Sequence, residues 1–254
     1  MTIYAAYARV YDRSGQIGFA LKMLPYLEKV LARHAFIGDS AVDVACGSGT
    51  LALALAQKGW RVYGVDASPD MLAQARCKAI ELAQPAAVTW LQADMRQFSL
   101  PRSVDLAIST YDSLNYLLTL DDLARAFGCV AASLRAGGLF VFDMNTEQAF
   151  QQTWDNSIFF VEDEALAIVL RGTYWPETRR AQTVITGFVR QGERYERFQE
   201  THTEQAYSRT EVVEALQASG FQVAASYGCF TFEAADEASR RVLWVARKKS
   251  EQAA

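Results

Sequence analysis

The chain has 254 residues, of which 51% are hydrophobic and 21% charged, and its formal net charge is −4 at pH 7. This is the composition of a globular protein long enough for one domain that carries an insertion. The acidic balance argues against a nucleic-acid partner, and the lack of any run of about 18 apolar residues argues against a membrane span. Its four cysteines show no metal-ligand spacing, so we expect neither a metal site nor a disulfide framework. No export signal is recognised at the N-terminus, and the cytoplasm is the expected location.

Two tyrosines near the N-terminus precede a predicted helix. Tyr7 and Tyr11 stand four residues apart, on one face of a short helical segment. Residues 16–34 then carry apolar side chains at helical spacing, Leu21 among them, and we expect this helix to lie over the mouth of a ligand site. Tyr7 would then reach the substrate and Tyr11 the cofactor, although both rings could instead anchor the helix to the core.

Strands and helices alternate over residues 41–143. We expect strands near 41–45, 61–66, 88–92, 104–110 and 139–143, and helices near 50–58, 69–83 and 121–135. The apolar strands and intervening amphipathic helices are typical of a parallel sheet covered on both faces. The fold class is therefore α/β, with a Rossmann-like, doubly wound sheet.

A glycine-rich turn follows the first strand of this sheet. Gly47 and Gly49 leave room for a ligand next to the backbone, and a helix opens directly after them. Asp43 lies four residues before Gly47, and its negative charge disfavours a phosphate ligand and favours a cation. The sign of the charge points to the sulfonium and ammonium groups of S-adenosylmethionine.

The next two strands also end in acids. Asp66 follows at the position where a carboxylate accepts hydrogen bonds from ribose hydroxyls. Met71 can pack on an adenine ring, and Asp94 can accept from the exocyclic amine of adenine, although it could equally be an ordinary solvated residue of a turn. Together the three acids predict one ligand pocket at the carboxyl edge of the sheet.

A polar cluster follows the fourth strand, where ligands of open α/β sheets bind. We expect Asp112, Asn115 and Tyr116 to act on the substrate, although Asn115 could instead hold a turn.

Residues 157–207 contain β-branched and aromatic runs separated by turn signals, so we expect an antiparallel insertion over about 148–207. His202 shares a strand face there with Phe198, Glu200 and Glu204, and it is either a general base or a surface histidine. A helix starting at Ser208 and two closing strands complete the chain.

These ordered motifs resemble the class I S-adenosylmethionine-dependent methyltransferases, and the resemblance spans most of the chain. It implies a mostly parallel seven-stranded sheet in one domain over residues 1–254, with a helical lid over 1–36. It also implies a cofactor site. The residues expected there are Tyr11, Asp43, Ala45, Gly47, Gly49, Asp66, Ala67, Met71, Asp94, Met95 and Thr110.

Within that family, the chain is similar to small-molecule methyltransferases with an N-terminal tyrosine-rich helix, such as glycine and amino-sugar N-methyltransferases. We therefore expect a small-molecule acceptor, with nitrogen slightly favoured over oxygen, and a monomer or homodimer. Two alternatives stay open from the sequence. One is a non-catalytic module that binds S-adenosylmethionine, and the other is an NAD-dependent oxidoreductase, which Asp43 disfavours.

Overall fold

The computed structural model describes residues 3–83 and 88–250 of the chain. Seven strands form the main sheet in the order β10-β11-β5-β4-β1-β2-β3. The strands are β1 (Ser40–Val44), β2 (Arg61–Asp66), β3 (Val88–Gln92), β4 (Val104–Ser109), β5 (Leu134–Asn145), β10 (Phe221–Gly228) and β11 (Arg241–Lys248). The first five are parallel, and β11 pairs antiparallel with both β5 and β10. The predicted α/β class and the mostly parallel seven-stranded sheet are confirmed.

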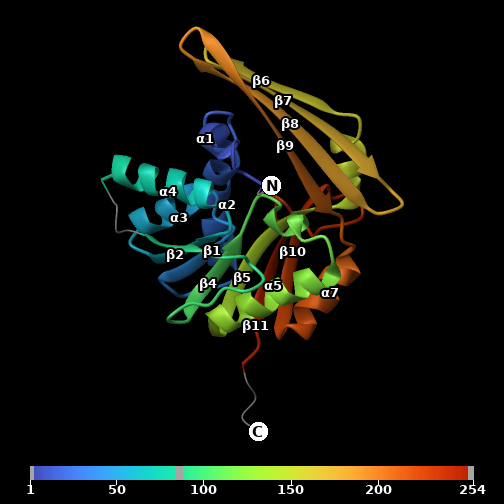
Figure 1. The fold of residues 1–254 in the computed structure, drawn as a ribbon. Coiled ribbons are helices and arrows are strands. Elements are labelled where there is room, and N and C mark those ends of the chain that lie inside the picture. The colour runs from blue at the N-terminus through green and yellow to red at the C-terminus, as the bar shows by residue number, and fades with distance from the viewer. Residues whose placement is uncertain (1–2, 84–87, 251–254) are drawn as a thin grey trace.

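Helices cover both faces of this sheet (Figure 1). The helices are α1 (Ala8–Tyr11), α2 (Ile17–Arg33), α3 (Thr50–Gln57), α4 (Pro69–Glu81), η1 (Ser113–Tyr116), α5 (Leu120–Ser133), α6 (Glu147–Ala149), η2 (Phe150–Trp154) and α7 (Arg209–Ala218). Side chains alternate along each strand between two cores. On β5, Phe140 and Phe142 pack in the core that contains α5 and α7, while Leu139 and Val141 pack in the core that contains α2 and α3.

The end of α5 differs from the prediction. The helix stops at Ser133 rather than near 135, and β5 starts at Leu134 rather than near 139. Its first residues pair irregularly with β4, because Val104 faces Leu134 whereas Leu106 faces Leu139. The extra residues form a bulge that a pattern of alternating apolar residues does not reveal.

Helix α2 covers the sheet for most of its length and runs through Pro25. From Met23 onward the helix buries Met23 and Leu27 completely against the core, so this part is a layer of the fold rather than a cover for a ligand. Leu21, expected on the apolar face, is 59% exposed. The first turns of α2 line the cavity described below.

The insertion is a separate antiparallel sheet that lies beyond the end of β5, at the top of Figure 1. Its strands, β6 (Ile158–Asp163), β7 (Leu166–Trp175), β8 (Arg180–Gln191) and β9 (Arg194–Gln205), pair in chain order. Tyr7 and Val10 of the N-terminal segment pack on this sheet against Ile168 and Phe198. The insertion and the N-terminus together cover one end of the main sheet.

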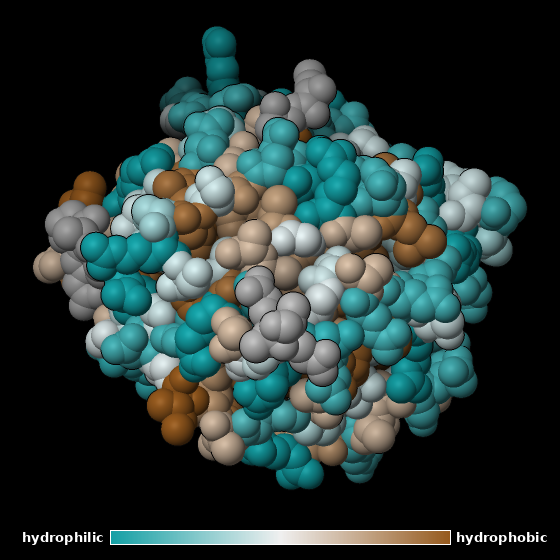
Figure 2. Space-filling view, turned by 90° about the horizontal axis from the view of Figure 1, so that it is seen from below, coloured by the Kyte–Doolittle hydropathy of each residue, from teal (hydrophilic) through white to brown (hydrophobic). Residues whose placement is uncertain are grey.

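The opposite face, seen from below in Figure 2, mixes hydrophobic residues with many hydrophilic ones. In the part of the chain that the structure describes, no helix is long and apolar enough to cross a membrane.

Candidate active site

A cavity of about 260 Å³ lies at the carboxyl ends of the parallel strands. It collects residues from the N-terminal segment, from α2 and from the turns after β1, β2, β3 and β4. Most of the predicted cofactor residues line it, namely Tyr11, Asp43, Ala45, Gly47, Asp66, Ala67, Met71, Asp94, Met95 and Thr110. The sequence therefore located the main cavity, with one exception in the glycine turn.

The two glycines of the turn do different things. Gly47 lines the cavity with a φ of +54°, and nothing lies within 4 Å of the place where a Cβ would stand. Gly49 does not line the cavity, and a Cβ there would collide with the Trp90 ring and approach Ala75. The prediction that Gly49 makes room for a ligand is wrong, because it makes room for Trp90 instead. Its φ of +74° also favours glycine.

Two acids, the buried Asp43 and the half-buried Asp66, set the electrostatics of this cavity. Asp43 is 3% exposed, and burial together with the nearby Asp66 raises its pKa to about 8. Burial also raises the pKa of Asp66, although its carboxylate accepts hydrogen bonds from the N–H groups of Gly47 and Ser68, each at 2.8 Å. Within the described residues neither acid has a basic partner in an ion pair. A cationic ligand would restore their charge, whereas a phosphate would be repelled.

Asp94 lines the cavity but already has a protein partner. Arg96 donates to its carboxylate from Nε at 2.9 Å and from Nη2 at 2.5 Å, and these bonds lower the pKa of Asp94. A contact between Asp94 and an adenine amine stays a prediction.

A second cavity of about 60 Å³ lies behind the first. The two share a wall made by Tyr4, Tyr11, Gln16, Tyr111 and Tyr116. Deeper residues of the second cavity come from three parts of the fold, and these include Tyr7, Asp112, Trp154, His202 and Glu204. Among the residues predicted to act on the substrate, Tyr7, Asp112 and Tyr116 are thus brought together, and we refer to this space as the inner chamber.

A chain of hydrogen bonds crosses the inner chamber. The Tyr116 hydroxyl lies 2.8 Å from the Tyr4 hydroxyl and 3.0 Å from Nδ1 of His202. Nε2 of His202 in turn lies 3.0 Å from Glu200. His202 is 3% exposed, so its interpretation as a surface histidine is wrong. Tyr7 is also buried, and its hydroxyl bonds to Ser14 at 2.9 Å.

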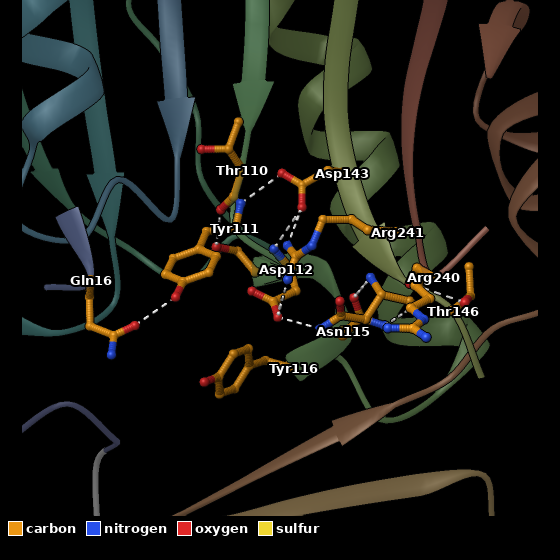
Figure 3. A network of polar contacts seen from close by, with 12 residues as sticks. Gln16, Thr110, Tyr111, Asp112, Asn115, Tyr116, Asp143, Thr146, Arg240 and Arg241 are labelled. Atoms are coloured by element: carbon orange, nitrogen blue, oxygen red, sulfur yellow. Dashed lines mark hydrogen bonds and ion pairs between the residues drawn. The ribbon is translucent and has the colours of Figure 1, made fainter. Parts of the chain in front are cut away.

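An ion cluster stabilises the turn after β4 (Figure 3). Tyr111 and Asp112 both have positive φ, and the Asp143 carboxylate accepts the N–H of Tyr111 at 2.7 Å and that of Asp112 at 3.2 Å. Arg241 pairs with Asp143 at 2.5 Å and with Asp112 at 3.1 Å. This arrangement orients the Tyr111 ring toward Gln16, and the Tyr111 hydroxyl donates a hydrogen bond to Oε1 of Gln16 at 2.6 Å.

Asn115 is not part of the site. It is fully buried, lines neither cavity, and donates from its amide to the carbonyls of Asn145 and Gln205 at 3.1 and 2.8 Å. Its side-chain oxygen accepts the N–H of Asn145 at 3.0 Å. Its side chain connects the ends of β5 and β9, so it has a structural role, although across strands rather than within a turn as the alternative interpretation expected.

Four residues of the site were missed from the sequence, namely Tyr4, Tyr111, Glu204 and Arg241. Glu204 had a usable signal, because it alternates with His202 on one strand face. Arg241 is the first residue of an apolar strand, which is an ordinary position for a solvated cation.

The sheet order, the open glycine turn and the acids of β1 and β2 define a class of protein. The chain belongs to the class I S-adenosylmethionine-dependent methyltransferases. Residues 41–138 match the family described as a methyltransferase domain. The chain is 30% identical over 247 residues to the Bacillus subtilis protein named Putative methyltransferase YqeM, and 97% of each chain is covered.

A solved structure and a more distant relative extend this comparison. The fold matches that of a S-adenosylmethionine-dependent methyltransferase from Clostridium acetobutylicum with a TM-score of 0.85 and 25% identity, over 98% of this chain and 100% of the other. The chain is also 33% identical over 105 residues to a Streptomyces venezuelae enzyme named dTDP-3-amino-3,4,6-trideoxy-alpha-D-glucopyranose N,N-dimethyltransferase, which covers 41% of this chain and 42% of that one. These matches are to methyltransferases, so they contradict both alternatives, the non-catalytic module and the NAD-dependent oxidoreductase.

The residues of the main cavity fit S-adenosylmethionine. Asp43 offers a carboxylate to the cationic end of the ligand, Gly47 clears the space beside it, and Asp66 can accept from ribose hydroxyls. We refer to the main cavity as the donor cavity. Within residues 3–83 and 88–250, no group of three His, Cys, Asp or Glu side chains could hold a metal ion.

Proposed function

We propose that the protein transfers a methyl group to a small-molecule acceptor bound in the inner chamber, and that the accepting atom is nitrogen. The observation that carries this proposal is the joining of two cavities through one tyrosine wall. S-adenosylmethionine in the donor cavity supplies the methyl group, and the inner chamber lies directly behind that wall. Because the chamber holds only about 60 Å³, a macromolecular acceptor could place at most a single side chain or base there.

The charge of the inner chamber supports nitrogen. It contains two buried acids, Asp112 and Glu204, and aromatic rings that also attract cations. An amine, which is cationic in water, suits these surroundings better than an alcohol or an acid. The Streptomyces venezuelae relative, whose name describes an N,N-dimethyltransferase of an amino sugar, is consistent with such an acceptor.

The chain's own residues would align the acceptor and exclude water. Tyr4, Tyr11 and Tyr116 line both cavities, so an acceptor in the inner chamber would meet the methyl group beside these rings. Alignment is the main requirement, because displacement at a sulfonium needs the accepting lone pair in line with the breaking bond.

Oxygen is the second candidate, since the Tyr116–His202–Glu200 chain could take a proton from a hydroxyl. The test is an acceptor screen with S-adenosylmethionine that carries an isotopically labelled methyl group, using amines and the alcohols that match them in shape. N-methylated products with silent alcohols would support the proposal, whereas labelled methyl on oxygen alone would reject nitrogen. The expected cytoplasmic location, the absence of nucleic-acid and membrane partners, and the monomeric or dimeric state stay predictions.

A further inference from the structure

Glu204 is a buried acid of the inner chamber that forms no ion pair with the described residues. It lies on β9, is 5% exposed and lines the chamber. Its Oε2 atom has no hydrogen-bond partner in the described structure. An unpartnered carboxyl oxygen in an enclosed space is costly, so its presence in the chamber points to a ligand that donates to it.

The groups around Glu204 are already engaged with one another. Asp112 approaches from the turn after β4, but Arg241 and Asn145 donate to its carboxylate. Arg241 is shared between Asp112 and Asp143 rather than paired with Glu204.

The other titratable groups that line the chamber also have partners or lack charge. His202, on the same strand face, has Tyr116 on one ring nitrogen and Glu200 on the other. The hydroxyls of Tyr4 and Tyr116 bond to each other, and burial raises their pKa values, which keeps them neutral. The Asp112 carboxylate accepts its bonds through Oδ2, whereas Oε2 of Glu204 is a fully buried acid oxygen of the described chamber without a partner.

Its surroundings also keep Glu204 protonated when no cation is nearby. Burial, and secondarily the charge of Asp112, raise the pKa of Glu204 well above its ordinary value, while the charge of Arg241 and a hydrogen bond with Asn145 act in the opposite direction. A bound ammonium group would favour the carboxylate, and the proton of the free site would be released to solvent.

We propose that Glu204 is the residue that binds the acceptor as an ammonium ion and then takes one of its protons, which makes the inner chamber specific for amines. This proposal rests on the proposed transfer to a small-molecule nitrogen and adds the group that recognises and activates it. Because the pKa of Glu204 is raised, it lies closer to the pKa of the amine, and transfer of a proton from the ammonium ion to the carboxylate costs less free energy. The neutral amine can therefore form inside the chamber.

The reaction balances in atoms and charge. One N–H bond of the ammonium group breaks, the proton passes to the Glu204 carboxylate, and the electron pair stays on nitrogen. That pair forms the new N–C bond as the C–S bond of the sulfonium breaks, and the electrons of the C–S bond stay on sulfur. A methylated ammonium ion, a neutral thioether and a protonated Glu204 result, and the product's departure lets Glu204 exchange its proton with solvent.

The test uses the whole protein saturated with S-adenosylhomocysteine and three probes of matched size, namely propylamine, 1-propanol and propionate. Binding is measured by titration calorimetry at pH 7 in two buffers of different ionisation enthalpy, which counts protons. We expect propylamine to bind at least about tenfold more tightly than the other two probes, with release of about one proton. Three probes that bind alike, absent propylamine binding, or no proton release would overturn the proposal.

The variant Glu204→Gln keeps the shape but cannot take a proton. We expect propylamine to bind it about 10- to 100-fold more weakly and without proton release, while S-adenosylhomocysteine binds as in the wild type. Glu196→Gln is the matched control, because Glu196 lies on the same strand with an exposed side chain that pairs with Arg9. Equal propylamine binding in all three proteins would refute the role of Glu204, and the proton count in the wild type tests it independently of any variant.

Turnover separates this proposal from the proposed function. With an amine acceptor found in the screen, Glu204→Gln should lose rate at pH 7 and recover as rising pH supplies the neutral amine. Amine methylation that is indifferent to Glu204→Gln would leave the proposed function standing and reject the role of Glu204. Methylation of alcohols alone would reject both.

Discussion

The Asp66 carboxylate, which is predicted to bind the ribose, also accepts the N–H groups of Gly47 and Ser68. We expect Asp66→Ala to weaken the binding of S-adenosylhomocysteine by about 2–4 kcal/mol, since two charged hydrogen bonds to ribose and the support of the glycine turn are both lost. Titration calorimetry measures this change. Asp70→Ala is the control, because Asp70 is an exposed acid in the first turn of α4, and unchanged affinity in Asp66→Ala would contradict the assigned register of the site.

Asp43 should make cofactor binding depend on pH. Its raised pKa of about 8 means that the free site holds a proton at pH 6, and a bound α-ammonium group favours release of that proton. We expect the Kd of S-adenosylhomocysteine to fall by up to about tenfold per pH unit between pH 6 and about 8 and then to level off. Asp43→Asn should abolish this slope, and a slope that persists in the variant would assign it to another group.

The raised pKa of Asp43 also affects the stability of the ligand-free protein. The folded state holds the Asp43 proton more tightly than the unfolded chain, in which the ordinary pKa is 3.8. The contribution of Asp43 to the free energy of unfolding therefore decreases as the pH rises from about 4 to about 8, because the folded state binds more protons in this range.

At the level of elements, the N-terminal segment depends on one side chain of the insertion. The Glu200 carboxylate accepts the N–H groups of Tyr4, Ala6 and Tyr7 at 2.9, 2.6 and 3.0 Å. Burial alone would raise the pKa of Glu200, but its hydrogen bonds with His202 and these N–H groups hold the pKa below its ordinary value. Because the folded-state pKa is lowered, this contribution to stability is present above about pH 4.5 and is lost as the pH falls through the folded-state pKa.

We expect Glu200→Ala to release this segment, since three N–H groups lose their acceptor. Hydrogen exchange at residues 4–7 should become faster, and the free energy of unfolding should fall by about 1–3 kcal/mol. Exchange followed by mass spectrometry and urea unfolding measure the two effects. Glu196→Ala, which removes the exposed ion pair with Arg9, should change neither appreciably, and equal protection in both variants would mean that the segment is held elsewhere.

The position of this segment bears on the predicted lid over residues 1–36. The structure places α1 between α4 and the insertion, while the second half of α2 belongs to the core (Figure 1). Closure of residues 1–36 over a bound ligand stays a prediction, and so does the assignment of residues 1–254 to one domain. If closure occurs, we expect it in the N-terminal segment that Glu200 anchors.

At the level of the whole molecule, Arg241 connects the last strand to the active site. It pairs with Asp143, which is fully buried, and with Asp112, which is 6% exposed. We expect Arg241→Met to lower the free energy of unfolding by about 3–5 kcal/mol, because two buried acids lose their cation. The loss should be smaller at pH 5 than at pH 8, since protonation relieves the uncompensated charge.

Urea unfolding at both pH values measures this loss. Arg125→Ala serves as the control, because Arg125 forms an exposed pair with Asp122 and should contribute less than about 1 kcal/mol. A pH-independent loss in Arg241→Met would indicate missing packing rather than buried charge.

The sequence predicts the parts of this protein that follow from local pattern. The strands themselves, the donor cavity and the insertion depend on periodicity and on acids at strand ends, which neighbouring residues determine. The inner chamber depends on contacts between distant segments. Arg241 meets Asp112 across 129 positions of the chain, and Glu200 binds residues nearly 200 positions earlier. Gly49 and Asn115 were misassigned for the same reason, because Trp90 and Gln205 lie far from them in the sequence.

The titratable residues of the two cavities lie partly on different stretches of sequence. Asp43 and Asp66 of the donor cavity lie within residues 41–138, as does Asp112 of the inner chamber, whereas Glu204 and His202 belong to the inserted sheet, which spans β6 to β9. Recombination at the borders of the insertion could therefore change the range of acceptors while leaving the source of the methyl group untouched. A protein built in this way can acquire a new acceptor specificity by exchange of the inserted sheet, while its cofactor site stays the same.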